Sequence, residues 1–171
     1  MRDPRDDLEE SRADAPAGLF LSRRANWFHD QERVRHHRLA QLLTGSISRD
    51  LHGGLVVTTG RDTLPFVAED APLVVLSVDV DVGADSIIVL LSDQAREELG
   101  HVVVGSDHRL RTPVRDGAFW ALFTRSAAQL LEPFVDGDSF VVGARRWPIS
   151  PLSVDWARRP ALASTHPGFE P

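Results

Sequence analysis

Residues 72–91 read PLVVLSVDVDVGADSIIVLL, and this stretch decides the fold class of the chain. Valine, leucine and isoleucine are dense on both sides of a Gly83–Asp85 turn, and residues of this kind favour extended strands. In the first arm valines alternate with Asp79 and Asp81, which predicts one buried face and one solvated face. The stretch therefore predicts a long β-hairpin, and a hairpin of this length needs a larger sheet around it.

Shorter elements lie on both sides of this hairpin. A first short hairpin is expected to close around Asp30-Gln31-Glu32, and two helices are expected, one beginning near His36 and one ending the run 118–131. Leu39, Leu42 and Leu43 support the first helix through their spacing. Further strands are expected at Leu55–Thr59, around Phe66 and Val67, at His101–Val104 and at Arg109–Val114. Together these elements predict an α+β protein with mainly antiparallel sheets.

An internal repeat is suggested by the order of these elements. Leu39-Ala40-Gln41-Leu42-Leu43 is matched by Ala127-Ala128-Gln129-Leu130-Leu131, and each segment is followed by an acidic turn, a hydrophobic strand and a proline. The ordered series predicts two small halves that share a hairpin-helix-strand motif. The alternative is that any amphipathic helix before a strand produces such matches.

The chain divides into four segments on this basis. Residues 1–18 are polar, charged and interrupted by prolines, which predicts a disordered acidic tail. A first α+β unit is expected at 19–72 and a second, carrying the long acidic hairpin, at 73–152. Residues 153–171 contain three prolines and no periodic apolar face, so we expect a loose C-terminal tail.

Charge is segregated along the chain, although the net value is only −6. All 19 basic residues are arginine, and lysine, tyrosine and cysteine are absent, a bias that a GC-rich genome explains. Residues 19–61 hold seven arginines and three acids, whereas residues 62–98 hold nine acids and one arginine. A net-acidic chain disfavours nucleic acid as the partner. No apolar run is long enough to span a bilayer and the start lacks a signal peptide, so we expect a cytoplasmic protein with no membrane contact.

Three segments resemble one known family. They are Trp27-Phe28-His29-Asp30, Arg35-His36-His37-Arg38-Leu39 and the run from Pro65 through Glu69-Asp70-Ala71-Pro72 to Val75. Over roughly residues 26–150 the pattern resembles the bacterial domain-of-unknown-function family 1285. Gln31 departs from the glycine that the family usually has in the hairpin turn. The resemblance implies an α+β protein with repeated motifs in two halves, a signalling role and no established catalytic residues.

The densest chemical cluster surrounds the start of the first helix. It contains His29, Asp30, Arg35, His36 and Arg38, and Glu69 and Asp70 are candidate spatial neighbours. Imidazole and carboxylate groups together can bind a divalent metal or transfer protons, which would suit a metal-dependent hydrolase. The more ordinary interpretation is a helix start rich in surface histidine and arginine. Because cations there oppose the helix dipole, an anion or an acidic partner is also a candidate.

Two further motifs bear on function. Trp147 beside Arg145 and Arg146 could bind an anion or a partner. Pro72 places Ala71 in an extended conformation, so Glu69-Asp70-Ala71-Pro72 is expected to enter an edge strand or a bulge. Its two acids are expected to pair with groups such as Arg35 or Arg38, and the alternative is that they line a groove between the halves.

The sequence thus predicts a non-enzymatic regulatory, signalling or protein-interaction module, with no cofactor, no bound metal and no catalytic residue. The expected partner is a protein or a small anionic ligand, and a homodimer is an open alternative. The competing hypotheses are a hydrolase using His29, Asp30, His36, Glu69 and Asp70, and a sensor of an anionic small molecule. The candidate groove consists of His29, Asp30, Arg35, His36, Arg38, Glu69, Asp70, Arg145 and Trp147.

Overall fold

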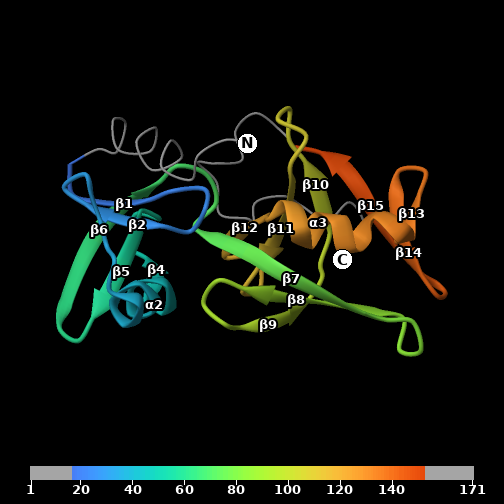
Figure 1. Cartoon of the computed structure of the whole chain (residues 1–171), viewed down its shortest axis with the longest axis horizontal. Coiled ribbons are helices and arrows are strands. Elements are labelled where there is room, and N and C mark those ends of the chain that lie inside the picture. Colours follow the sequence, from blue (N-terminus) through green and yellow to red (C-terminus); the bar gives the residue numbers. More distant parts are fainter. Residues whose placement is uncertain (1–16, 153–171) are drawn as a thin grey trace, which may run out of the picture. The chain divides into compact units, whose positions relative to one another are not determined.

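The computed structural model describes residues 17–152 of the chain. The described part divides into two compact units, residues 17–72 and residues 73–152 (Figure 1). The predicted tails lie outside the described residues, except for 17 and 18 at the end of the first. The fold is mainly β rather than α+β, because helix in the described part is limited to two short α-helices and one 3-10 turn.

The first unit is a mixed sheet with one helix beside it. Its strand order is β3-β2-β1-β6-β5-β4, in which β1 and β6 are parallel and the other neighbours are antiparallel. The elements are β1 (Leu19–Leu21), β2 (Trp27–His29), β3 (Glu32–Arg33), α2 (His37–Gly45), β4 (Ile47–Arg49), β5 (Leu55–Thr59) and β6 (Asp62–Ala68).

The β2–β3 hairpin turns through two residues. Asp30 and Gln31 both have positive φ, 47° and 69°. Two consecutive left-handed residues form the turn type whose twist matches paired strands, and glycine or asparagine usually occupies the second position. Gln31 adopts that conformation without being glycine. Glu32, which was expected in the turn, is the first residue of strand β3 and pairs with His29.

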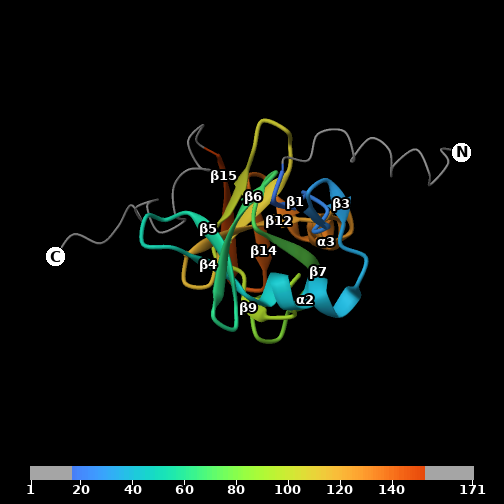
Figure 2. The same ribbon diagram turned by 90° about the vertical axis from the view of Figure 1, so that its left-hand side faces the viewer.

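A tryptophan joins the helix of the first unit to its sheet. Trp27 is buried, and its indole N–H donates a 2.9 Å hydrogen bond to the Thr44 hydroxyl on α2. The ring of Phe66 packs edge-on against the indole, with 4.9 Å between centroids. Leu43 and Thr44 are the buried residues of α2, which lies beside β5 (Figure 2).

The second unit contains the long hairpin that the sequence predicts. β7 (Leu73–Asp81) pairs with β8 (Ser86–Leu91), and the register shifts between Val75 and Ser77. Val78 and Val89 are buried while Asp79 and Asp81 are exposed, but Val80 is only half-buried and Val82 is exposed, so the predicted buried face ends before the turn. The remaining elements are β9 (Arg96–Glu98), β10 (Val102–Val104), β11 (Leu110–Val114), β12 (Phe119–Phe123), α3 (Arg125–Leu131), a 3-10 turn (Glu132–Phe134), β13 (Val135–Asp136), β14 (Ser139–Val142) and β15 (Arg145–Pro151).

Six strands of the second sheet follow the strand order of the first. The order β12-β11-β10-β15-β14-β13 corresponds to β3-β2-β1-β6-β5-β4, and α3 takes the chain position of α2. The central pair is parallel in both sheets, with Leu19 opposite Phe66 in one and Val102 opposite Ile149 in the other. The second sheet continues beyond β12 through β7, β8 and β9, and β7 is parallel to β12.

Candidate functional site

His29 and Asp30 lie at the end of β2 and in the turn that follows it. Both side chains are largely exposed, and Nδ1 of His29 is 3.7 Å from Oδ2 of Asp30. The other Asp30 oxygen accepts a 2.8 Å hydrogen bond from the Gly18 backbone N–H. Asp30 therefore fixes the start of β1 against the hairpin turn, which is a structural role.

The basic segment Arg35–Arg38, at the start of α2, is exposed throughout. His36 is the N-cap residue, and its Nδ1 accepts a 3.3 Å hydrogen bond from the Leu39 backbone N–H. Arg35, His37 and Arg38 are exposed, and the structure shows no ion pair for them among residues 17–152. This segment therefore presents cationic groups to solvent, with His36 holding the helix end in place.

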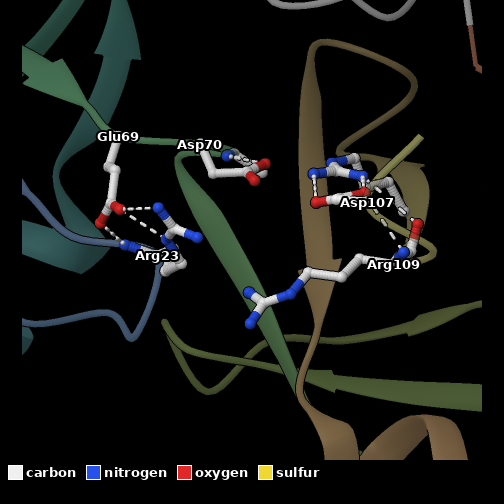
Figure 3. A network of polar contacts seen from close by, with 7 residues as sticks. Arg23, Glu69, Asp70, Asp107 and Arg109 are labelled. Atoms are coloured by element: carbon white, nitrogen blue, oxygen red, sulfur yellow. Dashed lines mark hydrogen bonds and ion pairs between the residues drawn. The ribbon is translucent and has the colours of Figure 1, made fainter. Parts of the chain in front are cut away.

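Glu69 pairs with an arginine that the sequence did not suggest. The backbone N–H of Arg23 donates to Oε2 of Glu69 at 2.9 Å, and the Arg23 guanidinium contacts Oε1 (Figure 3). The expectation that Arg35 or Arg38 pairs with Glu69 is wrong. Because β6 is parallel to β1, the chain after β6 runs beside the chain after β1, whereas Arg35 follows β3 at the far edge of the sheet.

The predicted hydrolase residues of the first unit do not form a metal site. His29 is in register with Leu19, while the backbone N–H of Glu69 bonds to the carbonyl of Leu21, two residues further along β1 and on its other side. Strand geometry separates the two backbones by roughly 10 Å or more. Among residues 17–152 no group of three or more histidine and acidic side chains is placed to hold a metal ion. Asp70 accepts a hydrogen bond from the Ala71 N–H at 2.8 Å.

Arg145 and Trp147 belong to the second unit and have partners within it. Trp147 is buried, and its indole N–H donates to the Leu99 carbonyl at 3.0 Å. The Arg145 guanidinium lies 4.7 Å from the centre of the Trp147 ring and also pairs with Glu98. The neighbouring arginine, Arg146, pairs with Asp136 at 2.8 Å. Acidic side chains of the same unit therefore already neutralise both arginines, which weakens the case for an anion site here.

The exposed leucines of α2 were not anticipated from the sequence. Leu39, Leu42 and Leu43 share helical spacing, yet only Leu43 is buried, and Leu39 and Leu42 are 43% and 53% exposed. Thr44 occupies the neighbouring buried position because its hydroxyl accepts the Trp27 indole N–H. The spacing of the leucines cannot reveal which side of α2 faces the sheet. That orientation depends on the hydrogen bond between Trp27 and Thr44, which lie on different elements.

A buried arginine of the second unit also has a dedicated acid. The Arg111 side chain is 4% exposed and forms a two-point ion pair with Asp107, with bonds of 2.8 and 3.1 Å. The Arg111 hydrogen bonds lower the pKa of the Asp107 carboxyl to about 2. Gly105 leaves room for the pair, because a Cβ there would lie within 2.6 Å of both side chains. This arrangement stabilises the fold and offers no reactive group.

Solved structures with a similar fold include two proteins of one family. A DUF1285 family protein from Silicibacter pomeroyi DSS-3 superposes with a TM-score of 0.64 at 16% identity, over 85% of each chain. A DUF1285 family protein from Shewanella baltica OS155 superposes with a TM-score of 0.52 at 14% identity, over 69% of this chain and 92% of the other. The chain therefore has a DUF1285-like fold, which agrees with the resemblance to that family, although the fold is mainly β and not the α+β fold that the resemblance implied.

Sequence comparison adds nothing to this assignment. No family model and no curated protein matches the chain.

Neither α-helix of the described part has the length and apolar character needed to cross a bilayer.

Proposed function

We propose that the protein is a non-enzymatic regulatory module that binds an acidic partner protein through the outer side of α2. The α2 surface is defined as Arg35, His37, Arg38, Leu39 and Leu42. The observation that carries this proposal is the combination of two half-exposed leucines with neighbouring arginines that have no ion pair in the described chain.

The charge of the α2 surface favours an anionic partner. Arginines near the first turn of a helix face the positive end of the helix dipole, which costs about 0.3–1 kcal/mol for each charge at low salt. No acidic residue occupies the first turn of α2 to offset this cost. Carboxylates of a partner would therefore interact favourably with both the arginines and the helix end.

The leucines favour a protein partner over a small anion. Leu39 and Leu42 are three residues apart and lie on neighbouring positions of one helix face. Burying both against a partner would contribute about 1–3 kcal/mol, because each is already about half covered. An acidic segment with apolar residues, such as one face of an amphipathic helix, has the matching chemistry.

Comparison with α3 supports a specialised role for α2. We propose that the two units arose by internal duplication, which the common order of six strands supports. In the aligned repeat Leu130 corresponds to Leu42 and is also exposed, but Ala127 replaces Leu39 and is buried. The first turn of α3 carries Arg125 alone, so α3 lacks the basic and apolar surface of α2.

The test is a binding titration by fluorescence anisotropy. The probe is a short fluorescein-labelled helical peptide with leucine on one face and glutamate on the other. The full chain is expected to bind it, and exchanging glutamate for lysine in the peptide should abolish binding. The double variant R35E/R38E should weaken binding at least about ten-fold, equivalent to about 1.4 kcal/mol. The matched control Arg125→Glu on α3 should leave binding unchanged.

Two results would contradict the proposal. Equal affinity of the R35E/R38E and wild-type chains would exclude the α2 surface, provided that their circular dichroism spectra agree. A nucleotide or acidic metabolite that raises the melting temperature and displaces the peptide would favour the small-molecule sensor.

A further inference from the structure

An acidic segment of the same chain has the composition that the α2 surface requires of a ligand. Residues 6–10 read DDLEE, which places four acids around the single leucine Leu8. The carboxylates suit the arginines of the α2 surface, and the leucine suits its exposed Leu39 and Leu42. We call residues 6–10 the acidic segment, and it precedes the part of the chain that the structure describes.

The first unit fixes the point at which the chain arrives from this segment. The backbone N–H of Gly18 donates to Oδ1 of Asp30 at 2.8 Å, and the Asp30 N–H donates to the Gly18 carbonyl at 3.0 Å. Val34, which precedes Arg35, donates its backbone N–H to the Trp27 carbonyl at 2.8 Å. Gly18 and Val34 are therefore both tied to β2, on opposite sides of that strand.

The acidic segment is long enough to reach the α2 surface from Gly18. Trp27 is opposite Leu21, so Gly18 and Val34 are offset by three residues along the strands, about 10 Å, and by two strand spacings across the sheet, about another 10 Å. Arg35 therefore lies roughly 15–20 Å from Gly18. From residue 10 to residue 18 the chain can extend to about 26 Å. Both positions belong to the first unit, so the second unit does not affect this distance.

The α2 surface offers cations that have no acid beside them. Arg23 already pairs with Glu69, and Arg33 donates a 2.8 Å hydrogen bond to a neighbouring side-chain carbonyl. By contrast, the structure shows no ion pair for Arg35 or Arg38 within residues 17–152, and both are exposed. Carboxylates that approach from Gly18 therefore find unneutralised charge at the start of α2.

We propose that the acidic segment of the same chain occupies the α2 surface and competes there with the acidic partner, an inference that rests on the proposed function of that surface. A short tether gives an effective concentration of about 1 mM. A contact with an intermolecular Kd of about 0.5 mM would then cover the surface about two thirds of the time and weaken partner binding about three-fold. A partner with more leucines than Leu8 alone would displace the segment.

Paramagnetic broadening in the full chain tests the contact without any partner. The chain contains no cysteine, so Ser11→Cys provides a single site for a nitroxide label beside the acidic segment. Backbone amides of residues 35–42 are expected to broaden. The double variant D7K/E9K in the same labelled chain should restore most of their intensity, because it leaves the acidic segment with no net charge.

The leucine-glutamate helical peptide measures the competition. The D7K/E9K chain should bind this peptide at least about three-fold more tightly than wild type, because its α2 surface is no longer covered. The matched control is D62K/E132K, which makes the same change in net charge at two exposed acids of the described part. This control should bind the peptide like wild type and should keep the broadening of residues 35–42.

The two measurements separate the failure of this contact from the failure of the proposed function. A peptide that binds no chain would contradict the proposed function, whereas the label reports the contact without the peptide. Broadening that is missing at residues 35–42, unchanged in D7K/E9K, or confined to another basic position such as Arg61 would overturn the contact. Equal peptide affinity of D7K/E9K and D62K/E132K would overturn the competition.

A mixture of two chains tests whether the contact is intramolecular. One chain carries the nitroxide label, and the other is isotope-enriched and has no label. The enriched chain is expected to show no broadening at residues 35–42. Broadening there would assign the acidic segment to the α2 surface of a second copy and would overturn the contact within one chain.

Discussion

The Asp107–Arg111 pair allows a quantitative prediction for Asp107→Asn. This substitution keeps the shape of the side chain and one oxygen, which accepts the Arg109 backbone N–H at 3.2 Å, but removes the charge. Arg111 remains charged at a position where only 4% of its side chain is exposed. Removing the partner of a buried charge is costly, because the charge loses its compensation and stays desolvated.

The pKa of Asp107 sets the magnitude. A depression from the ordinary value of 3.8 to about 2 corresponds to about 2.4 kcal/mol of favourable interaction with the ionised form. The Asp107 side chain is 43% exposed, however, and solvent screens such pairs. We therefore expect Asp107→Asn to lower the free energy of unfolding by about 1 kcal/mol near neutral pH.

The sign of the pH dependence follows from the direction of the shift. A carboxyl whose pKa is lower in the folded state stabilises the fold at pH values above its unfolded pKa of about 4. This contribution is lost as the pH falls toward the folded pKa of about 2. The difference between wild type and Asp107→Asn should therefore be constant between about pH 5 and 7 and should fall to roughly half by about pH 3.

The assay is urea unfolding followed by tryptophan fluorescence at a series of pH values. Each variant is compared with wild type at the same pH, so that acid effects shared by both chains cancel. Equal stability of the two chains at neutral pH would refute the reasoning, as would a difference that does not decrease below about pH 4.

Three further substitutions test contacts within each of the two units. Gly143→Ala should destabilise the second unit by about 1–2 kcal/mol in thermal unfolding, because Gly143 has φ of +57° and an added Cβ would collide with the Asp85 carboxylate. Trp27→Phe should cost about 1–2 kcal/mol in urea unfolding, since it removes the hydrogen bond to Thr44 and leaves a smaller ring, and an unchanged midpoint would contradict this role. His36→Ala should reduce stability by about 0.5–2 kcal/mol through loss of the cap on α2, whereas His36→Asn should largely retain it.

Features that depend on neighbouring residues in the chain could be predicted from the sequence. The hairpin of residues 72–91 forms where valines alternate with Asp79 and Asp81 around a turn. The turn at Asp30-Gln31 and the beginning of α2 near His36 are also found. In each case the signal is local, because strand alternation, turn residues and a cap act over a few positions.

Features that depend on distant pairing could not be predicted. Strand β1 has three residues, too few for a periodic signal, yet its parallel pairing with β6 determines that Glu69 meets Arg23. The mainly β character was missed for the same reason, since many strands here are only two or three residues long. The internal repeat remains a proposal, supported by the common order of six strands.

The candidate site likewise combines a local feature that the sequence predicts with a feature that depends on distant residues. The sequence identified the basic segment Arg35–Arg38, which is exposed as expected of a surface cluster. The spacing of Leu39 and Leu42 beside it predicts a helix but not their exposure, because the exposure depends on the hydrogen bond between Trp27 and Thr44. Identifying the α2 surface therefore requires both the composition of the segment, which the sequence gives, and the orientation of α2 against the sheet, which the structure gives.

Hydrogen–deuterium exchange of the full chain with and without the leucine-glutamate helical peptide tests the central claim most directly. The account predicts slower exchange of backbone amides in residues 35–45 when the peptide is present, and no change in α3 at residues 125–131. Protection confined to other segments, or equal protection of both helices, would contradict the assignment of the α2 surface as the binding site.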